Sequence, residues 1–255
     1  MPVIVMASPK GGVGKTAAAV NTAYLASRDN LRTLLWDLDP QGASSFYLAG
    51  AEPVKGRKLS KLLEGKSPIA RFIHEDVYPN LDFIPAHSSF RNFDIKLEQE
   101  HDGNALKDLL APLSEDTSLV ILDCPPTLSR LTEQVLDVAD KVYVPVVPTW
   151  LSLNSWDQLK DFVKDKKLGV KKLRPFFSMV DRRKNLHRDV LARGTELLTN
   201  PMPVAVPYAS VVERMGEEGQ PLERLAPRSP AAEEYRKIWQ AIQADLGLSR
   251  KRMFR

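Results

Sequence analysis

A glycine-rich stretch near the start of the chain constrains the fold more than any other feature. Residues 9–16 read PKGGVGKT, follow the apolar residues 3–7 and precede an alanine-rich segment that ends near Arg28. This order predicts a strand, a loop and a helix. Glycines let a loop turn its backbone N–H groups inward, and the helix N-terminus behind the loop favours anions. The stretch therefore predicts a polyphosphate site rather than an ordinary glycine-rich turn.

The spacing is that of a P-loop, so each position has an expected part in binding a nucleotide. Lys15 is expected to reach the β- and γ-phosphates, and the Thr16 hydroxyl to ligate Mg²⁺. Pro9 stands where the pattern has its first glycine, whereas the closing Gly14-Lys15-Thr16 is kept. The predicted nucleotide-binding residues are Lys10, Gly11, Gly12, Val13, Gly14, Lys15, Thr16 and Ala17.

A second lysine, Lys10, stands at the outer lip of this loop. It is poorly placed for phosphates that its own loop binds. Two interpretations remain open: a solvated loop lysine, or a side chain that reaches the phosphates of a second subunit.

Two later apolar runs end in carboxylates. Residues 33–36 are followed by DLDPQG, and residues 119–122 are followed by Asp123. In open α/β sheets, ligands bind at the carboxyl ends of the strands. We expect Asp37 near the Mg²⁺ shell, Asp39 to orient or activate the attacking water, and Asp123 to hold Mg²⁺ through water, as a Walker B aspartate does.

These motifs resemble those of the ParA/MinD family of deviant Walker A P-loop ATPases. Residues 10–16, KGGVGKT, resemble its first motif, DLDPQG its second, and the resemblance extends from Val3 to about Leu246. It implies ATP and Mg²⁺ as ligands and a slow, partner-stimulated ATPase. Lys10 would cross a nucleotide sandwich dimer, and the implied catalytic residues are Asp39, Lys10 and Lys15.

The resemblance also predicts which residues contact the adenine, and this chain departs from the family pattern at one position. By position in the family, Asp181 is expected to recognise adenine and Pro207 to pack on the purine. Many relatives carry a second hydroxyl directly after the P-loop threonine, whereas this chain has Ala17. One phosphate contact is therefore expected to be missing.

Alternating strands and helices predict an α/β protein, a P-loop three-layer fold with a mainly parallel sheet and helices on both faces. We expect one ATPase domain over residues 1–248 and a basic tail over residues 249–255. Further strands are expected at 81–85, 142–147, 174–180 and 203–208, and helices at 104–113, 150–166 and 229–246. Residues 43–80 are expected to form short helices without chemistry of their own.

The positive charge is unevenly distributed. The 255 residues carry a net charge of +4, and residues 164–193 hold eleven lysines and arginines against three aspartates. Such a block suits a polyanion, although a solvated helix face is the alternative. The expected DNA contacts are Arg182, Arg183, Lys184 and Arg188, with Arg250, Lys251 and Arg252 as second choices for DNA or anionic lipid.

Cysteine and histidine usage excludes several classes of protein. Cys124 is the only cysteine, so neither a disulfide framework nor a cysteine-held cluster is available. It is expected to be a small buried neighbour of Asp123. The four histidines lack metal-ligand spacing and are expected in surface or loop positions. Without a recognisable signal peptide or spanning segment, we expect a cytoplasmic, nucleoid-associated protein.

Three functions remain open. The first is a ParA-like ATPase that dimerises around ATP, binds DNA without sequence preference and moves plasmid, chromosome or protein cargo, stimulated by a ParB-like or cargo-adaptor protein. The second is a MinD-like membrane-associated ATPase, for which the tail offers only Met253 and Phe254 among cations, so a membrane partner is not favoured. The third is a metabolic ligase or kinase of the same fold. In the family that the motifs resemble, the loop and helix after the strand at 142–147 lie at the dimer face, so Trp150 is a candidate for the dimer interface; Trp150 and Trp156 could instead belong to the core.

Overall fold

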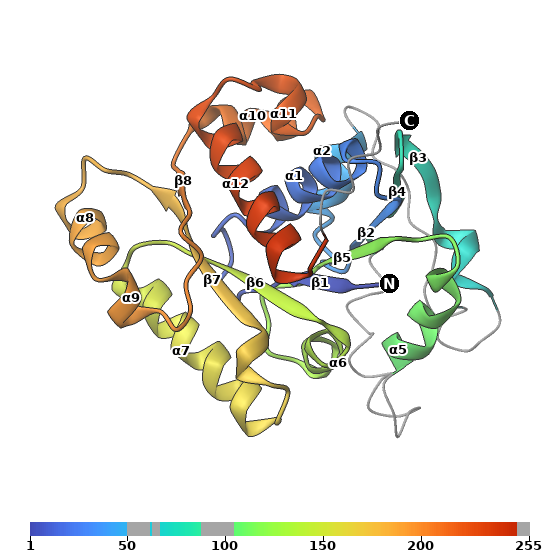
Figure 1. Ribbon diagram of the computed structural model, residues 1–255, viewed down its shortest axis with the longest axis horizontal. Coiled ribbons are helices and arrows are strands. Elements are labelled where there is room, and N and C mark those ends of the chain that lie inside the picture. The colour runs from blue at the N-terminus through green and yellow to red at the C-terminus, as the bar shows by residue number, and fades with distance from the viewer. Residues whose placement is uncertain (50–61, 63–66, 88–104, 249–255) are drawn as a thin grey trace.

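The computed structural model describes residues 1–49, 62, 67–87 and 105–248. Its centre is an eight-stranded sheet (Figure 1). The strands are β1 (Val3–Met6), β2 (Thr33–Asp37), β3 (His74–Tyr78), β4 (Leu81–Ile84), β5 (Leu119–Asp123), β6 (Lys141–Val146), β7 (Leu173–Val180) and β8 (Ala205–Pro207). Their order in the sheet is β3-β4-β2-β5-β1-β6-β7-β8. Neighbouring strands pair in parallel except β3 with β4, which confirms the predicted mainly parallel sheet.

Successive residues of the central strands enter two different cores. In β1, Val3 and Val5 belong to one hydrophobic cluster, whereas Ile4 and Met6 belong to the other. Side chains of a strand alternate between the two faces of a sheet, and both faces are covered here. The uninterrupted apolar runs in the sequence follow from this double burial.

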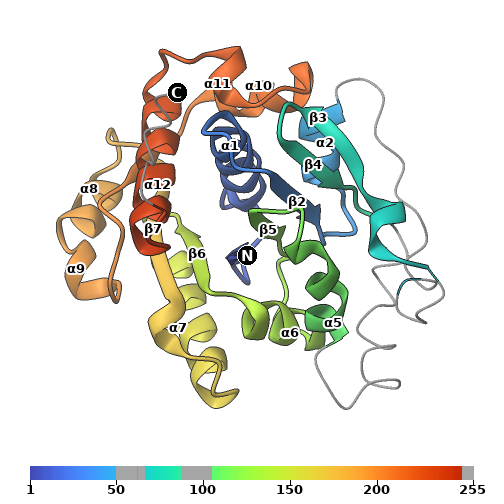
Figure 2. The ribbon, with the colours of Figure 1, turned by 45° about the vertical axis from the view of Figure 1, so that its right-hand side comes forward.

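Helices cover both faces (Figures 1 and 2). One face carries α1 (Lys15–Arg28), α2 (Ala43–Ala49), α10 (Ser210–Glu218), α11 (Leu222–Leu225) and α12 (Pro230–Asp245). The other carries α5 (Ala105–Leu110), α6 (Arg130–Val138), α7 (Trp150–Asp165), α8 (Asn185–Ala192) and α9 (Gly194–Leu197), with the 3-10 turns η1 (Ile69–Phe72), η3 (Ala111–Ser114) and η4 (Val170–Lys172). The result is the three-layer arrangement that the alternating elements predicted.

The last helix, α12, starts where local signals place it. The Ser229 hydroxyl accepts a hydrogen bond from the Ala232 N–H at 3.2 Å, and Pro230 occupies the first helical position. Both are typical of a helix N-terminus. Tyr235 and Trp239 are buried on its inner face.

Between residues 43 and 80 the prediction was incomplete, because the structure contains the edge strand β3 there. The strand is polar and only half-buried, and its pairing with β4 shifts register between His74 and Tyr78. Asp76, inside the strand, has a φ of +48°. An exposed, irregular edge lacks the apolar alternation by which strands are predicted.

Within the described part of the chain, none of the helices combines the length and apolar character needed to cross a membrane. The predicted basic tail, residues 249–255, lies outside the described residues, as does His101.

Candidate nucleotide-binding site

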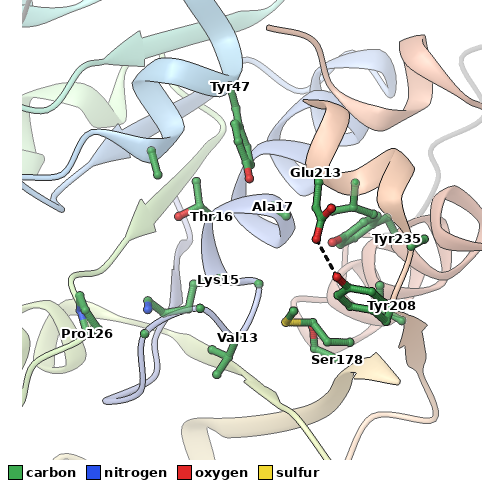
Figure 3. A pocket seen from close by; sticks show the side chains of 18 of the residues that line it. Val13, Lys15, Thr16, Ala17, Tyr47, Pro126, Ser178, Tyr208, Glu213 and Tyr235 are labelled. Atoms are coloured by element: carbon green, nitrogen blue, oxygen red, sulfur yellow. Dashed lines mark hydrogen bonds between the residues drawn. The ribbon is translucent and has the colours of Figure 1, made fainter. Parts of the chain in front are cut away.

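A cavity of about 420 Å³ opens at the carboxyl ends of the parallel strands (Figure 3). This is within the size range of small-molecule sites. At one end it is lined by the P-loop and the residues that follow β2 and β5, and at the other by the ends of β7 and β8 with α10 and α12. The lining residues are Gly11, Gly12, Val13, Gly14, Lys15, Thr16, Ala17, Asp39, Gln41, Ala43, Tyr47, Pro126, Ser178, Met179, Val206, Pro207, Tyr208, Ala209, Val212, Glu213 and Tyr235.

Backbone geometry explains why a glycine stands directly before α1. Gly14 has a φ of +91°, and a Cβ added there would lie 2.8 Å from the Ser178 Oγ. A side chain at this position would meet both backbone strain and a steric clash. Because Gly14 has no side chain, the loop can pass close to β7.

Lys15 begins α1 with its side chain buried. Its ammonium Nζ lies 3.4 Å from the Lys10 carbonyl oxygen, to which it donates. Burial lowers the pKa of Lys15, while the nearby Asp123 carboxylate acts in the opposite direction. A buried cation at the phosphate end of a cavity gains strongly from an anionic ligand.

Asp37 and Asp123 face each other at the ends of the neighbouring strands β2 and β5. Burial raises the pKa of both carboxyl groups, and the adjacent Asp123 raises that of Asp37 further. Both oxygens of Asp37 already accept hydrogen bonds: Oδ1 from the Asp39 N–H at 3.1 Å, and Oδ2 from the Ser45 N–H and hydroxyl, each at 3.0 Å. Asp37 thus holds the loop that carries Asp39 and the first turn of α2.

Asp123 has one oxygen that fits a hydrated cation. Its Oδ2 accepts from the Ser44 hydroxyl at 2.8 Å, and its buried Oδ1 has no hydrogen bond of good geometry within the described ranges, although the nearby Thr16 hydroxyl lowers the pKa of the carboxyl group. An unpaired buried carboxylate oxygen is costly unless something else contacts it. No group of three His, Cys, Asp or Glu residues suited to a metal occurs in the described chain. Mg²⁺ needs few such groups, because it is usually held by one or two carboxylates, waters and phosphates, so Thr16 and Asp123 fit it.

Asp39 lies in the loop after β2 and lines the cavity. Its Oδ1 accepts from the Gln41 N–H at 2.9 Å, and the Gly42 N–H donates to the Asp39 carbonyl at 2.9 Å. The turn holds a half-buried carboxylate at the mouth of the phosphate end. This position suits a group that orients water.

Lys10 points away from this cavity. It is absent from the lining residues, and its Nζ donates to the Ser152 Oγ at 3.0 Å in the first turn of α7. Trp150, in the same turn, is 56% exposed, whereas Trp156 is buried. That Trp150 contributes to a dimer interface stays a prediction.

Of the two predicted base contacts, the structure places Pro207 in the cavity wall and Asp181 outside it. The Asp181 carboxylate binds the Arg183 guanidinium at 2.8 and 2.9 Å, and this hydrogen bonding lowers the pKa of Asp181 to about 2. The far end of the cavity instead contains Tyr208, whose hydroxyl donates to Glu213 at 2.9 Å. Met179, with a φ of +53°, also lines it.

Several lining or supporting residues escaped the sequence analysis. Ser44 and Ser45 contact the paired aspartates, although residues 43–80 were expected to carry no chemistry. Two serines, separated from DLDPQG only by Ala43, are a signal that was available. Tyr47, Tyr208 and Glu213 gave no such signal, because only packing brings α2 and α10 to the P-loop.

The basic block of residues 164–193 does not form one surface. Its first part precedes β7 and its second part follows it, so the eight residues of β7 separate them by roughly 25 Å. Lys166 pairs with Glu133 and Arg174 with Asp245. The four predicted DNA contacts, Arg182, Arg183, Lys184 and Arg188, are exposed together around the start of α8.

His187 corrects one expectation and Cys124 meets another. His187 was expected at the surface, but it is buried in α8, where its Nδ1 accepts from the Asp181 N–H at 3.0 Å. Burial raises the pKa of the Cys124 thiol to about 12, so it stays protonated.

Comparison with known proteins agrees with this geometry. A family model described as an AAA domain matches residues 1–174. The chromosome-partitioning ATPase Soj of Treponema pallidum is 30% identical over 248 residues, which cover 94% of this chain and 96% of that protein. The sporulation initiation inhibitor protein Soj of Bacillus subtilis is 27% identical over 249 residues, 95% of this chain and 98% of that protein.

Solved structures share the fold. An ATP complex of an McdA variant from Cyanothece superposes with a TM-score of 0.79 at 22% identity, over 97% of this chain and 96% of that one. Cobyrinic acid a,c-diamide synthase from Mycobacterium smegmatis, with a bound ATP analogue and magnesium, gives a TM-score of 0.78 at 27% identity, over 96% and 95%. With the P-loop, the paired aspartates and the matched relatives, this chain belongs to the ParA/MinD family of P-loop ATPases.

Proposed function

We propose that the protein is a partition ATPase that dimerises when it binds ATP, holds DNA without sequence preference in that state, and releases it after hydrolysis. The main observation behind the proposal is that the two lysines of the P-loop lie in different environments. Lys15 is buried at the phosphate end of the cavity, whereas Lys10 is half-buried, does not line the cavity and donates to Ser152 of α7. Relatives that are named as chromosome-partitioning proteins support the proposal that this ATPase acts in partitioning.

Each residue of the site has a distinct part. The P-loop N–H groups and Lys15 bind the triphosphate, and Thr16 and Asp123 would hold hydrated Mg²⁺, which would neutralise negative charge on the phosphates. Asp39 orients the attacking water and accepts its proton. Lys10 leaves Ser152 and binds the nucleotide of the second subunit, which offsets the repulsion between two facing polyanions.

Electrostatics support DNA as the polyanion. Arg182 and Lys184 make no side-chain hydrogen bond or ion pair among the described residues, whereas Arg183 is paired with Asp181 and Arg188 is hydrogen-bonded to Asn185. A two-fold dimer would present two such clusters, and each neutralised phosphate adds a counterion-release contribution to the affinity. DNA binding should therefore need ATP and weaken steeply with salt.

The test measures binding to a random-sequence duplex by interferometry, with ATP and with ADP, over a range of salt concentrations. Arg182→Glu/Lys184→Glu is compared with Lys164→Glu/Lys171→Glu, which makes the same charge change at exposed residues on the other end of β7. Only the first variant should lose affinity, and its salt slope should fall by about one for each lost phosphate contact.

Equal binding in ATP and ADP, or equal losses in the two variants, would reject the DNA mechanism. Sedimentation with anionic liposomes runs in parallel. ATP-dependent liposome binding without DNA binding would favour the membrane-associated alternative instead.

A further inference from the structure

Ala17 leaves a gap in the polar lining of the cavity, and a phenol stands opposite it. The residue after the P-loop threonine carries no hydroxyl in this chain. Tyr47, from α2, lines the same cavity, and Figure 3 shows its hydroxyl directed down toward Thr16 and Ala17. In this view the hydroxyl lies between Lys15 and Glu213, and the charges of both Asp123 and Glu213 act on it (Figure 3).

The Tyr47 hydroxyl is a hydrogen-bond donor for which the described part of the chain offers no acceptor. It makes no hydrogen bond to any residue in the described ranges. Burial raises the pKa of Tyr47, with the negative charges of Asp123 and Glu213 acting in the same direction, so the phenol stays protonated. A half-buried, protonated hydroxyl aimed into a cavity is suited to an anionic acceptor in the ligand.

A glycine on the neighbouring helix determines where the ring lies. A Cβ added at Gly216 of α10 would lie 3.1 Å from Cε1 of Tyr47 and 2.9 Å from Cε1 of Phe46. Glycine inside a helix is unfavourable compared with alanine, so its presence indicates a close approach. The ring also packs against the cluster that contains Ala17. Tyr47 is therefore oriented before any ligand binds, which lowers the entropic cost of using it.

We propose that the Tyr47 hydroxyl donates a hydrogen bond to the phosphate nearest the sugar of the bound nucleotide, in place of the hydroxyl that Ala17 lacks. The inference rests on the proposed ATP-binding function and adds a binding residue to the same site. The phosphate nearest the sugar is chosen because the hydroxyl lies between Lys15 and Glu213 in the view of Figure 3.

The experiment is a double-mutant cycle on nucleotide affinity, measured by calorimetry with ATP and with ADP. Tyr47→Phe removes only the hydroxyl and should weaken both nucleotides by roughly tenfold, the scale of a hydrogen bond to a charged group. Ala17→Thr should restore most of that loss in the Tyr47→Phe background, because it supplies a hydroxyl on the other side of the same phosphate. Ala17→Ser serves as the smaller substitution, since Ala17 is buried.

Tyr208→Phe is the matched control, because Tyr208 is also a phenol in the cavity wall but donates to Glu213. Any loss in Tyr208→Phe should be unaffected by Ala17→Thr. Thermal unfolding without nucleotide should be the same for Tyr47→Phe and the parent, which separates binding from folding.

The outcomes distinguish failure of the proposed ATP binding from failure of the proposed Tyr47 contact. If the parent binds no ATP, the proposed function fails. If the parent binds ATP and Tyr47→Phe binds it equally well, only the Tyr47 assignment fails. A loss that disappears with 2′-deoxy-ATP or 3′-deoxy-ATP would place the hydroxyl on the ribose and overturn the phosphate contact. If neither Ala17→Thr nor Ala17→Ser restores the affinity lost in Tyr47→Phe, the Tyr47 hydroxyl does not stand in for the hydroxyl that Ala17 lacks.

Discussion

The Lys10 ammonium donates a hydrogen bond to the Ser152 hydroxyl, with Nζ and Oγ 3.0 Å apart. Ser152 is buried, and its Oγ also lies 3.2 Å from the Thr149 Oγ1. The lysine proposed to reach a second subunit is thus held by α7 of its own chain. A contact between subunits has to replace this bond, so the bond opposes dimerisation.

Ser152→Ala should therefore strengthen the ATP-dependent dimer. Each protomer would no longer have to break a bond worth about 1 kcal/mol, which corresponds to roughly tenfold or more in the dimer Kd. Sedimentation velocity with a hydrolysis-resistant ATP analogue measures this. Ser155→Ala is the control on the same helix, because the exposed Ser155 hydroxyl donates to the Leu151 carbonyl of its own helix and not to Lys10. A dimer Kd equal to the parent's in Ser152→Ala would show that the bond does not restrain Lys10.

Lys10→Ala should stay monomeric with ATP yet still bind it, because Lys10 does not line its own cavity. Lys15→Ala should fail earlier, at nucleotide binding, since its buried ammonium faces the phosphates. Light scattering and calorimetry separate the two steps. An ATP-dependent dimer of Lys10→Ala would remove the argument for a lysine shared across subunits.

Gly14→Ala should destabilise the protein even without nucleotide. Its φ of +91° and the 2.8 Å approach of the added Cβ to Ser178 predict a loss of about 1–3 kcal/mol in the free energy of unfolding. Gly11→Ala is the control, because its Cβ meets no atom within 4 Å, and it should stay within about 0.5 kcal/mol of the parent. Urea unfolding measures both. Equal stability of the two variants would contradict the geometry of the loop.

Asp39→Ala should bind ATP as the parent does but hydrolyse it about 10²–10⁴ times more slowly, because a water-orienting carboxylate acts mainly in the transition state. The variant should accumulate as an ATP-bound dimer. Single-turnover hydrolysis and filter binding give the two quantities. Hydrolysis at the parent rate would assign the role to another group.

His187 should make stability depend on pH below neutrality. Burial lowers the pKa of His187, with the Lys184 charge in the same direction and Asp181 opposed, and its Nδ1 must stay unprotonated to accept from the Asp181 N–H. The folded pKa lies below the unfolded value of about 6.5, so the contribution is present above that pH and is lost as pH falls toward the folded pKa. Urea unfolding between pH 5 and 8 should show a steeper decline in the parent than in His187→Asn. Parallel curves would refute this.

Local sequence was sufficient to predict the P-loop, the strands other than β3, and the apolar runs of the central strands. These features depend on residues close together along the chain: glycines that permit one loop conformation, alternation that enters two cores, and caps such as Ser229. The same reasoning failed at β3, where a polar, irregular edge strand shows no periodic pattern. It also misplaced His187, because scattered histidines without metal-ligand spacing were expected in surface or loop positions, whereas this one is buried in α8.

The arrangement of the site was decided by tertiary structure. Strand order places β5 between β1 and β2, and only this order brings Asp37 opposite Asp123 and Ser44 onto the Asp123 carboxylate. Packing of α10 on α2, made possible by Gly216, directs Tyr47 into the cavity. Asp181 was expected at the base, yet it binds the nearby Arg183 and leaves that end to Tyr208 and Glu213. A motif specifies its own backbone, whereas the partners of a buried side chain depend on which distant segments the hydrophobic core brings together.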